Sequence, residues 1–347
     1  MGVESRLSLA GAAEIARERF GIVGRASRLP SERDQNFKLD GAGGGAHVLK
    51  VFHRDEDPEF VAAQARVFHL LREVPRRVFP THAPTVEGDA YAQVSVPPPS
   101  GKGAGSGGER HIVWVTRFMA GEPAATAAAL PPRALHDLGS VLGQMDAVLA
   151  RNPQPAARRR LVWSAQSAPT VIRKHVHRVA GAERRALIMN ALAGYEAHAR
   201  PRLPEVRHSL VHNDVNDHNL LLEDGQVSAI LDFGDMLESY TACEVAHAAA
   251  YLMLDRPDPL AVAVALVEGY HAAYPLREAE LHVLFDLIRL RLTLSVVLSA
   301  HQQALRPDDP YLSVSEAPAW RLLERLAAGD PPRHEFMAAL LAVGGDR

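Results

Sequence analysis

The chain has 347 residues, of which 47% are hydrophobic and 23% are charged, and its formal net charge is -3 at pH 7. This length suggests two domains, and the nearly neutral charge excludes a broad electrostatic attraction to nucleic acid or anionic membranes. Cys243 is the only cysteine, which excludes an intramolecular disulfide framework and favours a reducing compartment. The N-terminus lacks the apolar core of a signal peptide, and no run approaches the roughly 18 apolar residues of a membrane span. We therefore expect a cytoplasmic protein.

The N-terminal region predicts one helix followed by a small sheet. Apolar residues recur at helical spacing over residues 8–20, with Glu and Arg between them. Short β-like runs then alternate with polar or glycine-rich turns, which predicts a three-stranded meander. The expected strands cover residues 26–29, 36–39 and 47–52, with turns at 31–34 and 41–45.

The pattern then predicts a helix over residues 57–74 and two further strands, over 85–96 and 112–118. The segment between these strands, residues 97–109, is rich in Pro, Gly and Ser, so we expect a flexible loop there. The second strand ends near Gly121, where the composition becomes helical.

From Gly121 onward the hydrophobic period is helical almost throughout. The expected helices cover residues 135–149, 168–180, 183–200, 241–254, 260–274, 278–298 and 317–328. The basic run at residues 158–160 is typical of a solvated turn, because the net charge gives no support to a nucleic-acid patch. The sequence thus predicts the α+β fold class, with a small β-rich lobe over residues 1–119 and a large, mainly helical lobe over 120–347.

Residues 209–237 carry the densest group of polar side chains that are suited to chemistry. Two apolar runs flank the hairpin signal Glu223-Asp224-Gly225, with Asp, Asn and His residues before the first run and Asp232 and Asp235 after the second. A hairpin folded at Gly225 brings both polar ends together. Carboxylates gathered so closely need a cation, most simply Mg²⁺. The alternative is that these polar residues only cap the hairpin.

Two other metals fit this segment poorly. His212 and His218 with the intervening Asp residues match none of the compact zinc-ligand spacings. The run from Asp214 to His218 is superficially similar to a calcium loop, but Asn219 replaces the required glycine and the distal Glu is absent.

The order His212-x-Asp214-x4-Asn219, then a strand pair and Asp232-Phe233-Gly234, resembles the catalytic loop and metal-binding aspartate of protein-kinase-like enzymes. The fuller string is similar to aminoglycoside and choline kinase-like phosphotransferases, in the branch that contains hydroxylysine kinase. This resemblance covers nearly the whole chain and implies a bilobal protein-kinase-like fold. It also implies a small-molecule kinase that transfers the γ-phosphate of ATP or GTP to a hydroxyl of an amino alcohol or hydroxylated amino acid, hydroxylysine first.

Two alternatives to this function remain open. One is an aminoglycoside- or macrolide-type antibiotic phosphotransferase, and the other, of a different class, is a non-catalytic nucleotide-binding module. No nucleic-acid or membrane partner is expected.

The resemblance assigns roles within the catalytic loop. Asp214 would accept a hydrogen bond from the substrate hydroxyl and orient it toward the γ-phosphate. Asn219 and Asp232 would bind the Mg²⁺ that bridges the phosphates. His212 would order the loop through hydrogen bonds without titrating in the reaction.

It also assigns nucleotide contacts to the first lobe. Lys50 would meet the α and β phosphates, although a snorkelling surface lysine is the alternative. Its expected partner on the following helix is Glu59 or Gln64, and the sequence does not decide between them. The other expected contacts are the polar turn that would cover the phosphates, unless it is only an exposed turn, and the backbone that would bind the base: Ser31, Arg33 and Gln35, then Thr116, Phe118 and Met119.

Acidic residues beyond the loop are candidates for an acceptor's ammonium group. Asp217 and Asp235 are the first, and they could instead complete the metal shell or cap loops. For Glu238 and Glu244 we favour a plain helix-surface role. Arg289 and Arg291, on an otherwise apolar helix, could meet a substrate carboxylate or pair with acids of the helical lobe, and we favour the second. Trp163 could pack over the substrate cleft or anchor the linker in the core, and again we favour the second.

Overall fold

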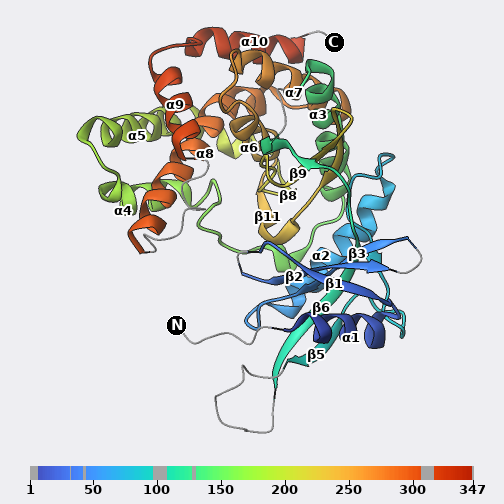
Figure 1. Cartoon of the computed structure of the whole chain (residues 1–347). Helices are drawn as coiled ribbons and strands as arrows, with labels where there is room; N and C mark the ends of the chain where they lie inside the picture. The colour runs from blue at the N-terminus through green and yellow to red at the C-terminus, as the bar shows by residue number, and fades with distance from the viewer. Residues whose placement is uncertain are drawn as a thin grey trace. The chain divides into compact units, whose positions relative to one another are not determined.

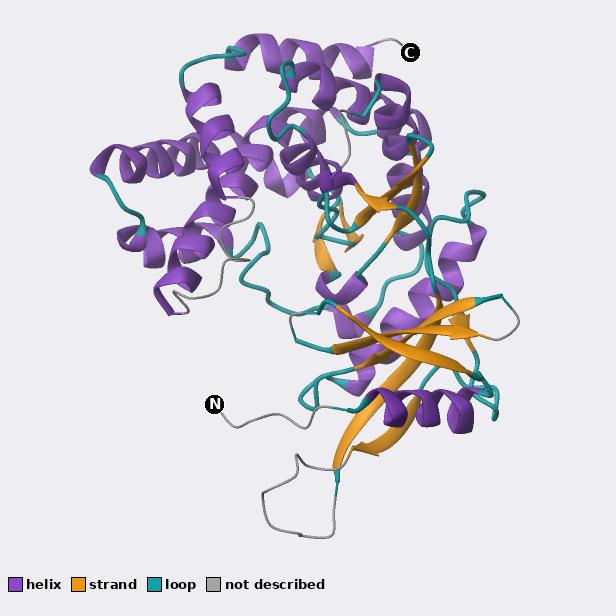
Figure 2. Cartoon of the chain, in the orientation of Figure 1, coloured by secondary structure: helices purple, strands orange, loops and turns teal. Residues whose placement is uncertain are grey.

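The computed structural model describes residues 7–31, 33–41, 44–96, 108–126, 130–305 and 316–345. The chain divides into two compact units, the first formed by residues 1–72 and 78–120 and the second by 73–77 and 121–347. The first unit is built on an antiparallel sheet and the second is mainly helical (Figures 1 and 2). This mixture of sheet and helix confirms the predicted fold class.

The sheet of the first unit has the strand order β1-β2-β3-β6-β4, and β5 also pairs with β6. Every pairing in it is antiparallel. The meander β1-β2-β3 was predicted within two residues at most of its strand ends. The strand bounds are β1 (Gly24–Leu29), β2 (Gln35–Gly41), β3 (Ala46–Val51), β4 (His82–Ala83), β5 (Ala92–Val96) and β6 (Glu109–Arg117).

The prediction of one strand over residues 85–96 was wrong in its first half. Thr85 N donates to Asp89 O at 2.7 Å, and Gly88 has a φ of 95°, so the chain turns there before β5 begins at Ala92. Gly tolerates this left-handed conformation, whereas an extended strand cannot contain it. The predicted loop over residues 97–109 lies mostly outside the described residues.

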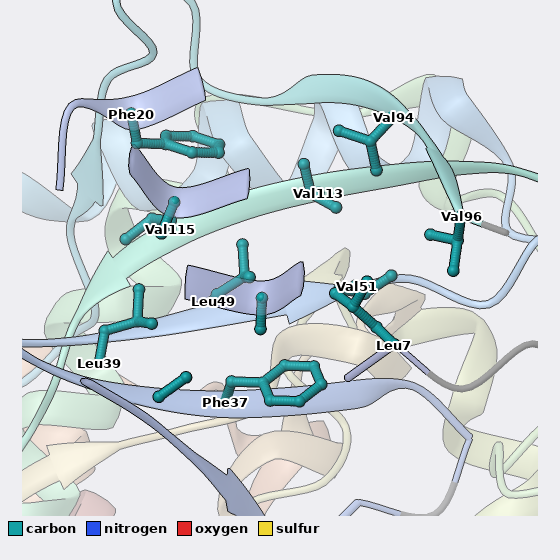
Figure 3. Packing of buried hydrophobic residues seen from close by; sticks show 13 residues of the cluster. Leu7, Phe20, Phe37, Leu39, Leu49, Val51, Val94, Val96, Val113 and Val115 are labelled. Atoms are coloured by element: carbon teal, nitrogen blue, oxygen red, sulfur yellow. The ribbon is translucent and has the colours of Figure 1, made fainter. Parts of the chain in front are cut away.

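One face of this sheet carries the core of the first unit. Helix α1 (Leu9–Phe20) lays Ala12, Ala16 and Phe20 on the sheet, and Phe37, Leu49 and Val113 meet them (Figure 3). Ser8 caps the start of the helix and Gly21, with a φ of 65°, ends it. Strand side chains alternate between faces, so the burial of Leu49 and Val51 in this core puts Lys50 on the other face.

Helix α2 (Pro58–Leu70) covers that other face. Its Phe68 lies 5.6 Å from the ring of Trp114, which is the register partner of Lys50. Gln64, one turn before Phe68 on the same side of the helix, is buried. Burial of apolar side chains on both faces thus holds Lys50 on a rigid strand.

The second unit contains the predicted hairpin and two further strand pairings. β9 (Leu220–Glu223) and β10 (Gln226–Ile230) are joined by Asp224 and Gly225, whose φ values are 51° and 72°. Positive φ at both positions is the signature of a type I′ hairpin turn, which confirms the predicted hairpin. The unpredicted pairs are β7 (Glu122–Pro123) with β9, and β8 (His208–Val211) with β11 (Leu237–Tyr240).

Helices make up the rest of the second unit. All seven predicted helices are present, although the second and third end earlier as α-helices and continue as 3-10 and π turns, and the last helix was not predicted. They are α3 (Pro132–Leu149), α4 (Ala168–His175), α5 (Ala182–Gly194), α6 (Ala242–Leu252), α7 (Pro259–Ala273), α8 (Glu278–Leu305), α9 (Glu316–Ala327) and α10 (Arg333–Gly345). No helix in the described part of the chain is long and apolar enough to cross a membrane.

Helices α3 and α7 approach each other closely because glycines line their contact. A Cβ added to Gly139 would lie 2.0 Å from Leu266 O, and one added to Gly269 would lie 1.9 Å from His136 O. Helix α8 packs against α4, α5, α6, α9 and α10 and is the central helix of this unit. The buried residues of α8 include a charged one, Arg291.

Candidate active site

His212 follows β8 directly and is fully buried. Its Nε2 lies 2.8 Å from Leu231 O, and Asp214 N donates to its Nδ1 at 3.2 Å. These partners assign the proton to Nε2. Burial lowers the pKa of the imidazole to about 4, against the opposing effects of Leu231 O and Asp232. The ring is therefore neutral, and it connects β8, the predicted catalytic loop (residues 212–219) and Leu231, which follows β10.

Glu244, on α6, holds the backbone of the same loop through hydrogen bonds. Its Oε2 accepts a hydrogen bond from His212 N at 2.5 Å. Burial raises the pKa of this carboxyl group to about 8, although hydrogen bonds from the backbone of His212 and Asn213 act in the opposite direction. The expected surface role of Glu244 is wrong, because every residue of α6 is buried.

Asp214 lies at the centre of the predicted site, with 24% of its side chain exposed. Its Oδ1 accepts from Arg291 Nη2 at 2.9 Å, and its Oδ2 accepts from Asn219 Nδ2 at 2.8 Å. Desolvation raises the pKa of the carboxyl group to about 7, Arg291 opposes this shift, and Asp235 and Asp232 add to it. The carboxylate is thus held in a fixed orientation by one cation and one amide.

Arg291 pairs with an acid of the second unit, as predicted, and that acid is Asp214 itself. One signal of this contact is visible in the sequence, a charged residue on an otherwise apolar helix. The position of the acid could not be read, because the two residues are 77 positions apart.

The metal ligands predicted in this loop lie beside Asp214. Asn219 uses its amide nitrogen for Asp214, so its amide oxygen is the group left to ligate a cation. Asp232, with a φ of 57°, follows β10 and its Oδ1 accepts from Gly234 N at 3.1 Å. The mutual repulsion of Asp214, Asp232 and Asp235 is one that a divalent cation would relieve.

This donor set fits Mg²⁺, which takes one or two protein carboxylates and fills its remaining positions with phosphate oxygens and water. Among the described residues, no three or more His, Cys, Asp or Glu side chains are grouped to hold a metal by themselves. An amide oxygen and a carboxylate would therefore bind the cation together with a phosphate-bearing ligand.

Arg159 of the basic run holds the segment after Asp232. Arg158 and Arg160 are exposed, as a solvated turn predicts, so the prediction fails for Arg159 alone. Arg159 donates to Met236 O at 3.3 Å and also to Gly234 O. The neighbouring Arg158 pairs with Glu238 at 2.7 Å. Glu238 lies on β11 rather than on a helix surface, because β8 and β11 form a pair that the sequence did not predict.

Asp217 is the acceptor candidate with the clearest unused group. Its Oδ1 is buried and has no hydrogen-bond partner among the described residues. Burial raises the pKa of this carboxyl group, with His218 as the largest opposing influence. A buried carboxylate oxygen without a partner is costly unless a ligand supplies the donor.

Lys50 forms an ion pair with Asp34, with Nζ 2.9 Å from Oδ2. The sequence pointed to Glu59 or Gln64 as the partner of Lys50, and Asp34 was not predicted. Glu59 lies exposed in the first turn of α2, and its N–H is capped by Asp57 at 2.9 Å. The Lys50 ammonium also lies 5.1 Å from the centre of the Phe52 ring.

The other nucleotide candidates belong to the same unit. Arg33 pairs with Glu56 at 2.8 Å, Gln35 Oε1 accepts from Leu7 N at 2.8 Å, and Ser31 is exposed. On β6, Thr116 is buried between β3 and β4, and Phe118 N donates to Ala46 O at 2.9 Å. Met119, the next residue, is partly buried.

The sequence of this chain matches a family model and several curated proteins. The family model described as "Phosphotransferase enzyme family" matches residues 25–281. Hydroxylysine kinase of Danio rerio is 30% identical over 333 residues, which cover 92% of this chain and 91% of that protein. Hydroxylysine kinase of Mus musculus is 28% identical, with 88% of this chain and 86% of that protein covered.

Solved structures show the same fold. A microcompartment-associated aminopropanol kinase superposes with a TM-score of 0.68 at 19% identity, over 94% of this chain and 99% of that one. An amicoumacin kinase in complex with AMP-PNP and Ca²⁺ superposes with a TM-score of 0.63 at 15% identity, over 88% of this chain and 89% of that one. The family and the reaction class predicted from the catalytic loop are confirmed: the chain belongs to the phosphotransferase enzyme family and is a kinase-type O-phosphotransferase.

Proposed function

We propose that this enzyme transfers the γ-phosphoryl group of ATP or GTP to the hydroxyl of a hydroxylated small amine, with hydroxylysine as the first candidate. The observation that carries the proposal is the oriented carboxylate of Asp214, held through both oxygens by Arg291 and Asn219. The similarity to vertebrate hydroxylysine kinases supports this acceptor. We place the reaction in the cytoplasm, where a chain with one cysteine meets a reducing environment.

In this proposal Asp214 accepts a hydrogen bond from the acceptor hydroxyl and receives its proton as the new P–O bond forms. The bond between the γ-phosphorus and the β–γ bridging oxygen breaks, and the nucleoside diphosphate leaves with that electron pair. Phosphoryl transfer passes through a loose transition state, so alignment and charge neutralisation matter more than base strength. The two hydrogen bonds, one to each oxygen, hold the carboxylate in one orientation, so the directions of its remaining lone pairs are fixed. His212, which is neutral and bonded through both nitrogens, keeps the loop in place.

Mg²⁺ bound by the amide oxygen of Asn219 and the carboxylate of Asp232 would neutralise phosphate charge. In the first unit, Lys50 would bind α and β phosphate oxygens, and Ser31, Arg33 and Gln35 would bind the remaining phosphate. The base would bind backbone groups near Thr116, Phe118 and Met119. Lys50 and Arg33 are both paired with carboxylates, so a nucleotide would exchange one anionic partner for another.

For the acceptor, Asp217 and Asp235 are the proposed ammonium ligands. The partnerless Oδ1 of Asp217 would gain the hydrogen-bond donor that it lacks, and a neighbouring positive charge would favour its ionised form. Hydroxylysine carries an ammonium group on the carbon next to its hydroxyl, so one molecule could contact Asp214 and Asp217 together.

The test is a panel of acceptors incubated with ATP or GTP and Mg²⁺, with phosphate esters measured as products. Hydroxylysine, ethanolamine, choline, homoserine and an aminoglycoside form the panel, and lysine is the matched control because it lacks only the hydroxyl. We expect transfer to hydroxylysine and none to lysine. Transfer to the aminoglycoside alone would replace the proposed acceptor, and transfer to none of them, despite nucleotide binding, would contradict the proposal.

A further inference from the structure

The guanidinium of Arg291 is the most completely enclosed cation near the proposed site, with 3% of the residue exposed. Each of its three nitrogens donates a hydrogen bond. Nε donates to Tyr251 Oη at 3.2 Å, Nη1 donates to Trp163 O at 2.9 Å, and Nη2 donates to Asp214 Oδ1 at 2.9 Å. The rings of Trp163 and Tyr251 lie 5.5 and 5.3 Å from its central carbon.

Such an environment fixes the guanidinium in one position. A buried charge is tolerated only where hydrogen bonds and an opposite charge replace its hydration, and three elements supply them here. The carbonyl comes from the linker before α4, the phenol from the end of α6, and the carboxylate from the catalytic loop. Arg suits this task better than Lys because its donors are arranged in a rigid planar fork.

We propose that Arg291 is a positioning residue: it sets the orientation of the Asp214 carboxylate toward the acceptor hydroxyl. This inference rests on the proposed function of Asp214. Asn219 holds Oδ2 of the same carboxylate, so Arg291 and Asn219 together determine the rotation of the group about its Cβ–Cγ bond.

The other use of a buried arginine beside the acceptor would be to bind an acceptor carboxylate. The geometry favours positioning, because every guanidinium nitrogen already donates to a protein oxygen at ordinary hydrogen-bond distance. One N–H on each of Nη1 and Nη2 is left over, but with only 3% of the residue exposed these groups offer little surface to a ligand carboxylate. Arg291 therefore acts on the reaction through Asp214.

The first experiment compares Arg291→Gln and Arg291→Lys with wild type, and uses Arg289→Gln as the matched control. Arg289 lies two residues earlier on α8 and stacks on Phe285 instead of contacting Asp214. We expect Arg291→Gln to lower kcat about a hundredfold, because small displacements of a reacting group have effects of this size. Nucleotide KM should change less than about threefold, Arg291→Lys should lie between, and Arg289→Gln should match wild type. Thermal unfolding of each variant reports whether the fold is intact.

The second experiment keeps the inference testable even if Arg291→Gln does not fold. Tyr251→Phe removes only the hydroxyl that accepts from Arg291 Nε, and we expect kcat to fall about fivefold, as for loss of one hydrogen bond. In the Arg291→Lys background the same change should have no further effect, because lysine has no Nε–H to orient. An equal loss in both backgrounds would show that Tyr251 acts independently of Arg291 and would overturn the inference.

Different results would refute the proposed function and the positioning role of Arg291. A wild-type protein that phosphorylates no acceptor would refute the proposed function and this inference with it. An active wild type with an unimpaired, folded Arg291→Gln variant would refute the inference alone. If Arg291→Gln raises the KM of a carboxylate-bearing acceptor and leaves that of ethanolamine and both kcat values unchanged, Arg291 binds the substrate instead.

Discussion

The loop of residues 212–219 in the second unit and the proposed phosphate-binding residues of the first unit are held in opposite ways. In the loop, His212, Asp214 and Asn219 are bonded to one another and to buried residues. In the first unit, Lys50 pairs with Asp34 and Arg33 pairs with Glu56, and 55% of the Arg33 side chain is exposed. Hydrogen bonds, both neutral and charged, fix the loop. Lys50 and Arg33 are held instead by ion pairs, whose carboxylates a phosphate could replace.

This difference agrees with the tasks proposed for the two sets. A group that orients an acceptor hydroxyl must be in place before the substrate arrives, since misplacement raises the barrier directly. A group that binds phosphate can be held by a carboxylate until the nucleotide replaces it. Substitutions in the loop should therefore lower kcat, and substitutions among the cations should mainly weaken nucleotide binding.

The largest expected effect is from Asp214→Asn. The amide can neither accept the proton nor keep its ion pair with Arg291, so we expect kcat to fall by about a thousandfold or more. The nucleotide dissociation constant should stay within about threefold of wild type, because the loop backbone is held by Glu244 and His212. Product formation and nucleotide titration measure the two quantities separately.

The matched control for that substitution is Asp224→Asn in the turn of the β9–β10 hairpin. Asp224 is exposed and has a φ of 51°, a conformation that Asn adopts readily. Full activity is expected for this control. If Asp214→Asn is as active as the control, Asp214 is not the acceptor-orienting residue.

The second prediction concerns the other side of the comparison. Lys50→Met should lower kcat/KM for the nucleotide about a hundredfold, because a preorganised cation on the phosphates is lost. Arg54→Gln removes an exposed positive charge of the same unit that pairs with Glu109 at 2.8 Å, and it should change kcat/KM less than about twofold. Equal losses for both variants would mean that only net charge matters and would remove Lys50 from the site.

The part of the candidate site that local chain order determines could be predicted from the sequence. His212, Asp214, Asn219 and Asp232 are connected by one hairpin, so spacing alone predicted that they would meet. Arg291 reaches Asp214, and Arg159 reaches the carbonyls of Gly234 and Met236, from distant segments. No pattern in the sequence states which acid or carbonyl a distant cation will meet.

Burial was the second property that the sequence did not determine. Glu244 was expected on a helix surface because a charged residue usually lies there. Helix α6 is surrounded on all sides, so its carboxyl group became the support of the catalytic loop instead. The short strands β8 and β11 were missed for a related reason, because each is only four residues long and their pairing joins segments far apart in the chain.

The third prediction tests that support. Glu244→Ala leaves the buried N–H groups of His212 and Asn213 without their acceptor, and we expect the free energy of unfolding to fall by about 4 kcal/mol. Glu244→Gln keeps an acceptor oxygen in nearly the same volume and should cost about half as much. Chemical denaturation near neutral pH compares them, and a loss below about 1 kcal/mol in both variants would show that the loop holds itself.

The fourth prediction is a pH dependence of stability due to His212. Its folded pKa, lowered by burial to about 4, lies below the ordinary value of 6.5, so the unfolded chain binds a proton between these values and the folded protein does not. Stability from this residue is therefore present above pH 6.5 and is lost as the pH falls toward 4, by about 3 kcal/mol at most. His212→Gln should lack this contribution, so the difference between its unfolding free energy and that of wild type should shrink steadily as the pH falls. A constant difference would mean that the pKa of His212 is the same in the folded and unfolded protein.

The smallest effect is expected at Glu238, which pairs with Arg158 on the surface near the end of the loop. Their side chains are 35% and 65% exposed, so water screens the pair and its loss should cost less than about 1 kcal/mol. Because Glu238 is engaged outside the loop, Glu238→Gln should also leave the KM of an amine acceptor within about twofold of wild type.

Asp217→Asn, measured in the same assay as Glu238→Gln, should raise the KM of the amine acceptor about tenfold, since the buried Oδ1 of Asp217 is the group that lacks a donor. If the two variants exchange these effects, the acceptor's ammonium group binds at β11 and the acidic residues of the loop serve the metal alone.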